Sequence, residues 1–140
     1  MRKVIKIGRI RIVIPSNIEI ISEIDLDQLL KDYHIHGNQP RRNDALLIFK
    51  YKDRTFATII EDTGHPSLND LNRLHEMPEK LKQRKILKPN MIIMKVLHHK
   101  GMGTGLLVHI ARSYRIELQE CHRSIDLGLI LRRRNHVRRK

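Results

Sequence analysis

The sequence predicts one α/β domain, a mixed sheet in which an antiparallel meander is flanked by helices. Short segments rich in β-branched residues alternate with segments whose apolar residues recur every three or four positions. This order predicts strands and helices packed in layers around one core. A length of 140 residues is typical of a single domain. We assign residues 1–131 to the domain and residues 132–140 to a flexible, basic C-terminal arm.

The N-terminal part predicts a hairpin followed by a helix. In "VIKIGRIRIVIP" apolar and basic residues alternate on both sides of Gly8, so residues 3–14 are expected to form a hairpin or bent strand that extends the domain. In "SEIDLDQLLKDY" the apolar residues have near-helical spacing and Ser22 is a suitable N-cap, which predicts a helix over 22–33. The "HIH" of residues 34–36 is a candidate short strand.

The rest of the chain predicts further strands and helices. Both faces of the strands expected over 44–51 and 54–62 are largely apolar, so helices are expected to cover the sheet on each side. Ser67 is a cap candidate for a helix that Pro78 ends or kinks, with an exposed continuation in "EKLKQRK". A strand in "MIIMKVLHH", a loop in "KGMGTG" and a helix in "LLVHIARSYRI" follow. One or two last strands are expected in "RIELQECHR" and "SIDLGLILRRR".

The composition predicts an intracellular protein with a polyanionic partner. Lys and Arg number 28 against 15 Asp and Glu, which gives a net charge of +13 and a positive field around any fold. A single cysteine, no secretory leader and no apolar run of about 18 residues predict a cytoplasmic protein without a membrane partner. Aromatic residues make up only 4% of the chain, which favours phosphate contacts with duplex or branched DNA over base stacking.

Two carboxylates are expected to face each other across the central hairpin. If Lys52 and Asp53 form a two-residue turn, Asp44 lies directly opposite Glu61, whereas a three-residue loop would substitute Asp62 for Glu61. Opposed like charges destabilise a strand pair unless a cation lies between them, and a divalent metal ion is a simple solution. The alternative is that both strand ends are solvated and their carboxylates pair with neighbouring arginines such as Arg41 and Arg42.

The segment "YHIHGNQPRRNDALLIFKYKDRTFATIIEDTG" resembles the core of the restriction-endonuclease-like nucleases, known by their PD-(D/E)xK motif. In layout it is most similar to archaeal Holliday junction resolvases. The resemblance covers roughly residues 20–120. It implies a DNA-binding, Mg2+-dependent (or Mn2+-dependent) endonuclease that hydrolyses phosphodiesters, with branched DNA as a candidate substrate and a homodimer as the assembly.

Residue by residue, the resemblance places Asp44 at the motif aspartate and Glu61 at the second metal-binding acid, with Asp62 as a further candidate ligand. Asn43 stands where proline is usual, and Thr63 stands where the family has a lysine that acts on the attacking water. A threonine hydroxyl replaces that lysine only weakly, although Lys95 on the next strand is a candidate to reach the site. Some family members also use a glutamate of the first helix, for which Glu23 is the candidate here; the alternative is an exposed first-turn acid.

The glycine loop and the histidines give weaker signals. "HHKGMGTG" lacks the third glycine of a dinucleotide fingerprint and the Gly-Lys-Ser/Thr of a P-loop, so a chain reversal is favoured over a nucleotide site. With one cysteine and no H-E-x-x-H, a zinc site is not expected.

Two principal hypotheses follow: a metal-dependent DNA endonuclease, and a non-catalytic nucleic-acid-binding protein on the same fold in which Thr63 marks a lost active site. A nucleotide-binding enzyme centred on the glycine loop is the third. The basic residues expected to contact nucleic acid are Arg41, Arg42, Lys100, Arg132, Arg133, Arg134, Arg138, Arg139 and Lys140.

Overall fold

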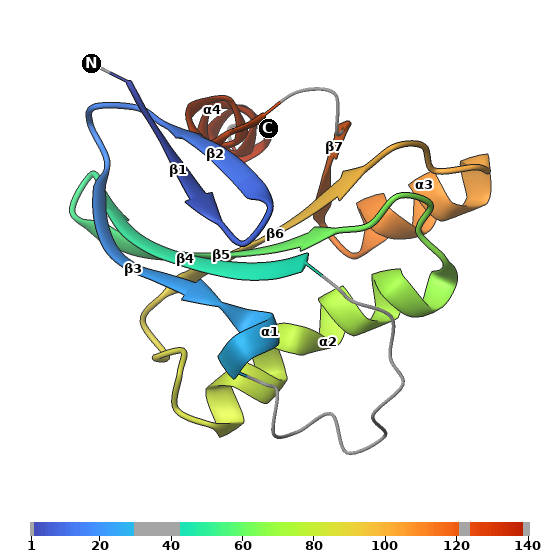
Figure 1. The fold of residues 1–140 in the computed structure, drawn as a ribbon, viewed down its shortest axis with the longest axis horizontal. Coiled ribbons are helices and arrows are strands. Elements are labelled where there is room, and N and C mark those ends of the chain that lie inside the picture. Colours follow the sequence, from blue (N-terminus) through green and yellow to red (C-terminus); the bar gives the residue numbers. More distant parts are fainter. Residues whose placement is uncertain (1, 30–42, 121–123, 139–140) are drawn as a thin grey trace.

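The computed structural model describes residues 2–29, 43–120 and 124–138, which form two mixed sheets flanked by helices (Figure 1). In chain order the elements are β1 (Lys3–Ile7), β2 (Ile10–Ile14), β3 (Glu19–Asp25), α1 (Leu26–Leu29), β4 (Asn43–Tyr51), β5 (Arg54–Asp62), α2 (Leu68–Gln83), β6 (Ile92–His99), α3 (Gly105–Ser113), β7 (Ile116–Glu120), β8 (Ile125–Asp126) and α4 (Leu127–Arg138). The α/β class expected from the sequence is confirmed.

The large sheet has the strand order β3-β4-β5-β6-β7, and its first three strands form an antiparallel meander. Lys52 and Asp53 form the two-residue turn between β4 and β5, and both have a left-handed backbone with φ of 50° and 62°, as a type I′ hairpin turn requires. The register that this turn sets pairs Asp44 with Glu61 and Phe49 with Phe56. The expected hairpin register is therefore confirmed.

The second half of the large sheet is parallel. β6 pairs in parallel with β5, and β7 pairs in parallel with β6, so each connection must cross over through a helix. These helices are α2 and α3, and both pack on the same face of the sheet as α1 (Figure 1). None of the helices in the described ranges is long and apolar enough to cross a membrane.

Helix α2 continues through Pro78, where it was expected to end or kink. Its buried side chains Leu71, Leu74, Met77 and Leu81 form one stripe against the sheet. Proline costs a helix interior roughly 3 kcal/mol, and burial of apolar side chains on both sides of Pro78, at about 1.5–3 kcal/mol each, outweighs that cost. The continuation beyond Pro78 is therefore only partly exposed.

The opposite face of the large sheet is covered by the small sheet β1-β2-β8 and by α4, not by helices alone as expected (Figure 1). The hairpin β1–β2 forms as the sequence predicts, and its inward residues Ile10, Ile12 and Ile14 are buried. They share a core with Phe49 and Val96 of the large sheet. The hairpin thus supplies a layer of the main core.

The prediction of a helix over 22–33 is wrong for residues 22–25. Residues 19–25 form β3, whose pairing extends from Glu19 opposite Lys50 to Asp25 opposite Ala45. The cap of the short α1 is Asp25, whose carboxylate accepts the backbone N–H of Asp27 at 3.0 Å. Ladder pairing along an edge of the sheet outweighs a helical spacing that few apolar residues support. The strand expected at 34–36 lies outside the described residues.

The C-terminal prediction is also corrected. β7 forms in the first of the two expected segments, but the second contributes only the short β8 and then becomes α4. Asp126 accepts the backbone N–H of Leu129 at 3.1 Å and so begins this helix. Leu127, Ile130 and Leu131 are buried at helical spacing. Residues 132–138, expected as a flexible arm, continue α4.

Candidate functional site

The acidic pair lies where the register places it, at the end of the β4–β5 ladder. Asp44 is directly opposite Glu61, and both side chains face the helix-covered side of the sheet, where they line a small cavity with Ile59, Leu74 and Met77. Glu61 is buried, with 3% of its surface exposed. A carboxylate at this depth requires compensating charge or hydrogen bonds.

Arg73 of α2 supplies positive charge to Glu61. Ser67 and Asp70 form a capping box at the start of the helix, in which each side chain accepts the other's backbone N–H. The second carboxylate oxygen of Asp70 accepts a bond from Arg73 Nη2 at 2.8 Å, and the same nitrogen donates to Glu61 Oε1. The cap that begins α2 therefore also positions the cation over the acidic pair.

The protonation of this cluster is fixed by its contacts. Burial disfavours the charge on Arg73, but hydrogen bonds and attraction from Glu61 and Asp70 outweigh it and raise the pKa of Arg73 above its usual value. Burial likewise opposes the charge on Asp70, while bonds from Ser67 and Arg73 prevail and lower the pKa of Asp70. Both groups are ionised at neutral pH.

The residues at this site do not fit a divalent metal ion in this conformation. The cavity beside Asp44 and Glu61 has a volume of about 10 Å³, room for no more than roughly one water. Arg73 lines the same cavity, and a guanidinium would repel a second cation there. Within residues 2–29, 43–120 and 124–138, no group of three or more His, Cys, Asp and Glu side chains is arranged to hold a metal.

Asp62 and Thr63 do not join the acidic pair. Asp62 is next to Glu61 on β5 and so points to the opposite face of the sheet. There its carboxylate lies 3.1 Å from Nδ1 of His98. Thr63 follows the last residue of β5, and its backbone N–H donates to the carbonyl of His98 at 2.9 Å. The pair of carboxylates is formed by Asp44 and Glu61.

Glu23 is also separated from the acidic pair. It lies on β3 rather than on a helix and pairs with Leu47, whose side chain belongs to the core on the opposite face from Asp44. The acid that the N-terminal region brings to the site is instead Asp27 of α1, which accepts the backbone N–H of Asp44 at 3.2 Å. The sequence did not predict this contact, because a helix over 22–33 would place Asp27 in its middle rather than in its first turn.

Lys95, the candidate substitute for the family lysine, lines a different depression. Its ammonium donates to the carbonyl of Tyr114 at 2.6 Å and lies 3.1 Å from Nδ1 of His75. Burial, and then the charge of Arg115, lower the pKa of Lys95. The pKa of His75 is lowered by burial and then by Lys95. Arg73, which contacts Glu61, and His75, which contacts Lys95, are two positions apart on α2 and so lie on opposite flanks of the helix. Helix α2 therefore lies between Lys95 and the acidic pair.

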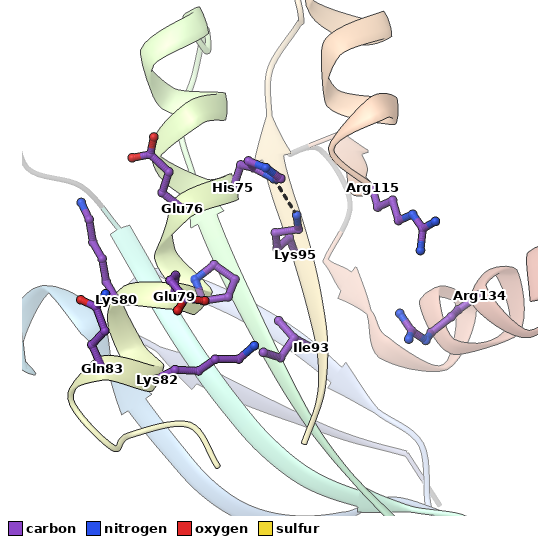
Figure 2. A pocket seen from close by; sticks show the side chains of 11 residues that line it. His75, Glu76, Glu79, Lys80, Lys82, Gln83, Ile93, Lys95, Arg115 and Arg134 are labelled. Carbon is purple, nitrogen blue, oxygen red and sulfur yellow. Dashed lines mark hydrogen bonds between the residues drawn. The ribbon is translucent and has the colours of Figure 1, made fainter. Parts of the chain in front are cut away.

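The depression that Lys95 lines is a basic groove of about 760 Å³ between the second half of α2 and β6 (Figure 2). Arg115 and Arg134 approach from the other side of β6, and Arg134 belongs to α4 (Figure 2). Five lysine or arginine side chains and two glutamates line this groove; the five cations are Lys80, Lys82, Lys95, Arg115 and Arg134.

Sequence reasoning missed most of this basic groove. Arg134 was expected to contact nucleic acid, but as part of an arm. The signal for the lysines was "EKLKQRK", interpreted only as an exposed continuation of a helix. Arg132 and Arg133 are exposed on α4, Arg133 pairs with Glu117 at 2.5 Å, and Lys100 is exposed after β6. The structure does not describe residues 41, 42, 139 and 140 or the side chain of residue 138, so the predictions for Arg41, Arg42, Arg138, Arg139 and Lys140 lie outside it.

Comparison of the chain with protein-family models, with curated proteins and with solved structures finds no match.

Proposed function

We propose that this chain is a nucleic-acid-binding protein in which Asp44 and Glu61 stabilise the fold and do not hold a catalytic metal ion. Both leading hypotheses from the sequence share a nucleic-acid partner, because a net charge of +13 favours polyanions under either. The observation that chooses between them is the ion pair from Arg73 to the buried carboxylate of Glu61. It supplies the positive charge that a divalent ion would supply in a nuclease.

The departure at Thr63 agrees with this choice. A nuclease of the family that the sequence resembles needs two acids, a metal ion and a lysine, and here a threonine stands at the lysine position. Lys95 does not substitute, because its ammonium is held by Tyr114 and His75 on the other side of α2. We retain the restriction-endonuclease-like arrangement as the finer description of the fold, with Asp44 on β4 and Glu61 on β5 at its two acidic motif positions.

A metal-dependent endonuclease acting on branched DNA is the second candidate. The direct opposition of Asp44 and Glu61 favours it, since two carboxylates at one strand edge are the expected start of an Mg2+ site. It requires Arg73 to leave Glu61 when the ion binds. The homodimer and the Mg2+ or Mn2+ cofactor that the resemblance implies belong to this candidate.

The deciding experiment measures binding and cleavage together. Fluorescently labelled linear, nicked and four-way DNA are incubated with the wild-type protein in EDTA, Mg2+ or Mn2+, beside the variants Asp44→Asn and Asp62→Asn. Asp62→Asn is the matched control, because it removes a neighbouring carboxylate on the opposite face. We expect DNA to bind equally in EDTA and in Mg2+, to remain uncut, and to bind Asp44→Asn as it binds the wild type.

Metal-dependent cutting that Asp44→Asn abolishes and Asp62→Asn retains would overturn the proposal in favour of the nuclease. Absence of binding to each of these DNAs, and to a labelled RNA strand in the same assay at 100 mM KCl, would overturn both candidates. We expect a plot of log Kd against log salt concentration to have a steep slope, because each duplex phosphate that the protein neutralises releases about 0.9 counterion.

A further inference from the structure

We propose that the basic groove between α2 and β6 binds the phosphodiester backbone of one nucleic-acid strand, an inference that rests on the nucleic-acid binding proposed above. The groove is separate from the acidic pair, which lines its own cavity on the other flank of α2. Its shape, charge and fixed donors each support a phosphate ligand.

The first support is charge that the described part of the protein leaves uncompensated. Lys82, Lys95 and Arg115 line the groove, and within the described residues none of them forms an ion pair with a carboxylate. Arg73 and Arg133, by contrast, each reach a glutamate. Glu76 and Glu79 also line the groove but leave an excess of cations. Cations that outnumber the acids around them repel one another, and an anion removes this repulsion.

The second support is a donor held in place before any ligand arrives. Lys95 donates two of its three N–H groups, to the carbonyl of Tyr114 and to Nδ1 of His75. The third N–H group can donate to a ligand. An ammonium can only donate, so Nδ1 of His75 accepts and the ring carries its proton on Nε2. The His75 ring is stacked on Tyr114 with centroids 4.0 Å apart, and the Tyr114 hydroxyl donates to Asn72 at 2.7 Å. These contacts tie α2, α3 and β6 together behind the donor.

The third support is the open beginning of β6. Pairing with β7 starts only at Lys95, opposite Ile116, so within the described residues no strand covers Ile92–Met94 on that side. Arg134 reaches the groove from α4, which lies on the other face of the large sheet (Figures 1 and 2). The groove therefore extends around the sheet edge, and cations from both faces can contact successive phosphates of one strand.

The size of the groove limits the ligand to one backbone. A volume of about 760 Å³ is in the range of pockets for small ligands, too small to enclose a duplex. A single strand, or one strand of a duplex lying along the opening, can present phosphates to Lys95 and Arg115. Such contacts read no bases, so we expect binding without sequence preference.

The test compares two double variants that remove equal charge. The groove variant is Lys82→Gln with Arg115→Asn. The control variant is Lys52→Asn in the β4–β5 turn with Arg54→Gln at the start of β5. The match includes the backbone, because Arg115 and Lys52 both have a positive φ, 58° and 50°, which asparagine tolerates. Fluorescence anisotropy with a labelled 20-nucleotide single strand and its duplex, in EDTA from 50 to 200 mM KCl, gives Kd and the salt slope.

We expect the groove variant to weaken binding about tenfold near 150 mM KCl and to lower the salt slope by roughly 2, one phosphate for each cation removed. The control variant should change both quantities much less. Equal weakening in the two variants would overturn the groove inference and leave the proposed function standing, whereas a wild type that binds neither strand nor duplex would overturn both.

A second measurement needs no variant and so does not depend on folding of a mutant. Lysine acylation followed by mass spectrometry is carried out on the wild-type protein with and without the same single strand. Protection of Lys82 and Lys95 with unchanged labelling of Lys52 supports the groove. Protection of Lys52 without protection of Lys82 and Lys95 would place the strand elsewhere and overturn the inference.

Discussion

The two flanks of α2 differ in how their charges are compensated. On the side of β4 and β5, the buried Glu61 is matched by Arg73, which Asp70 holds in turn. On the side of β6, Lys95 and Arg115 lie close enough for Arg115 to lower the pKa of Lys95, and neither has a carboxylate partner within the described residues. In a compensated buried pair each charge needs its partner, so removal of one partner is costly. Cations that converge without an equal number of acids instead favour binding of an anion. This difference is the basis for our proposal that the first flank is structural and the second binds a polyanion.

The largest expected effect comes from removing the cation of the compensated flank. Arg73→Met leaves the buried carboxylate of Glu61 without its Arg73 ion pair, so we expect the free energy of unfolding to fall by about 3 kcal/mol. Urea unfolding monitored by circular dichroism measures this. In the double variant Arg73→Met with Glu61→Gln, part of the loss should be recovered, because the buried side chain at position 61 then carries no charge that needs Arg73. A loss below about 0.5 kcal/mol in Arg73→Met would show that the pair contributes as little as an exposed one.

Removal of Lys95, on the β6 flank, should affect binding more than stability. Lys95→Met relieves the burial of a charge but leaves the carbonyl of Tyr114 without its donor, so we expect stability to change by no more than about 1 kcal/mol. Binding of the labelled single strand should weaken about tenfold. The same urea and anisotropy measurements serve both flanks. A large loss of stability with unchanged binding would make Lys95 a purely structural residue.

Low pH should reduce the stability that Asp70 contributes next to Arg73. The pKa of Asp70 is lowered from its ordinary value of 3.8, so its carboxylate contributes stability that is fully present above pH 3.8 and lost as the pH falls through the lower folded-state pKa. Asp70→Asn should therefore flatten the dependence of unfolding free energy on pH below that value. Unchanged pH dependence in this variant would assign the acid sensitivity to other carboxylates.

The smallest expected effect is a pH dependence of binding at the basic groove. The pKa of His75 is lowered from 6.5 by burial and by Lys95, so the ring is neutral at pH 7. Protonation of the ring ends the bond that it accepts from Lys95 but adds a cation to the groove. Phosphates nearby favour the protonated form, so binding should tighten modestly as the pH falls below 6.5. His75→Phe keeps the stacking on Tyr114 and should remove this dependence. An identical pH profile in His75→Phe would place the phosphates away from His75.

The sequence by itself determined the local features of this protein. The Lys52–Asp53 turn fixed the register that opposes Asp44 and Glu61, because a two-residue hairpin turn leaves one possible pairing. The Ser67–Asp70 capping box and the loop from β6 into α3 are local patterns of the same kind. The net charge of +13 predicted the class of partner whatever the fold.

Only the tertiary structure decided what lies next to these features. Residues 22–25 belong to a strand rather than a helix because β4 is available to pair with them. The second half of "SIDLGLILRRR" forms a helix because Ile130 and Leu131 bury against the core. The contacts of Arg73 with Glu61, and of Lys95 with Tyr114 and His75, join residues 12 to 20 positions apart. No local spacing encodes such contacts, since they depend on which flank of α2 each side chain faces after the helix packs on the sheet.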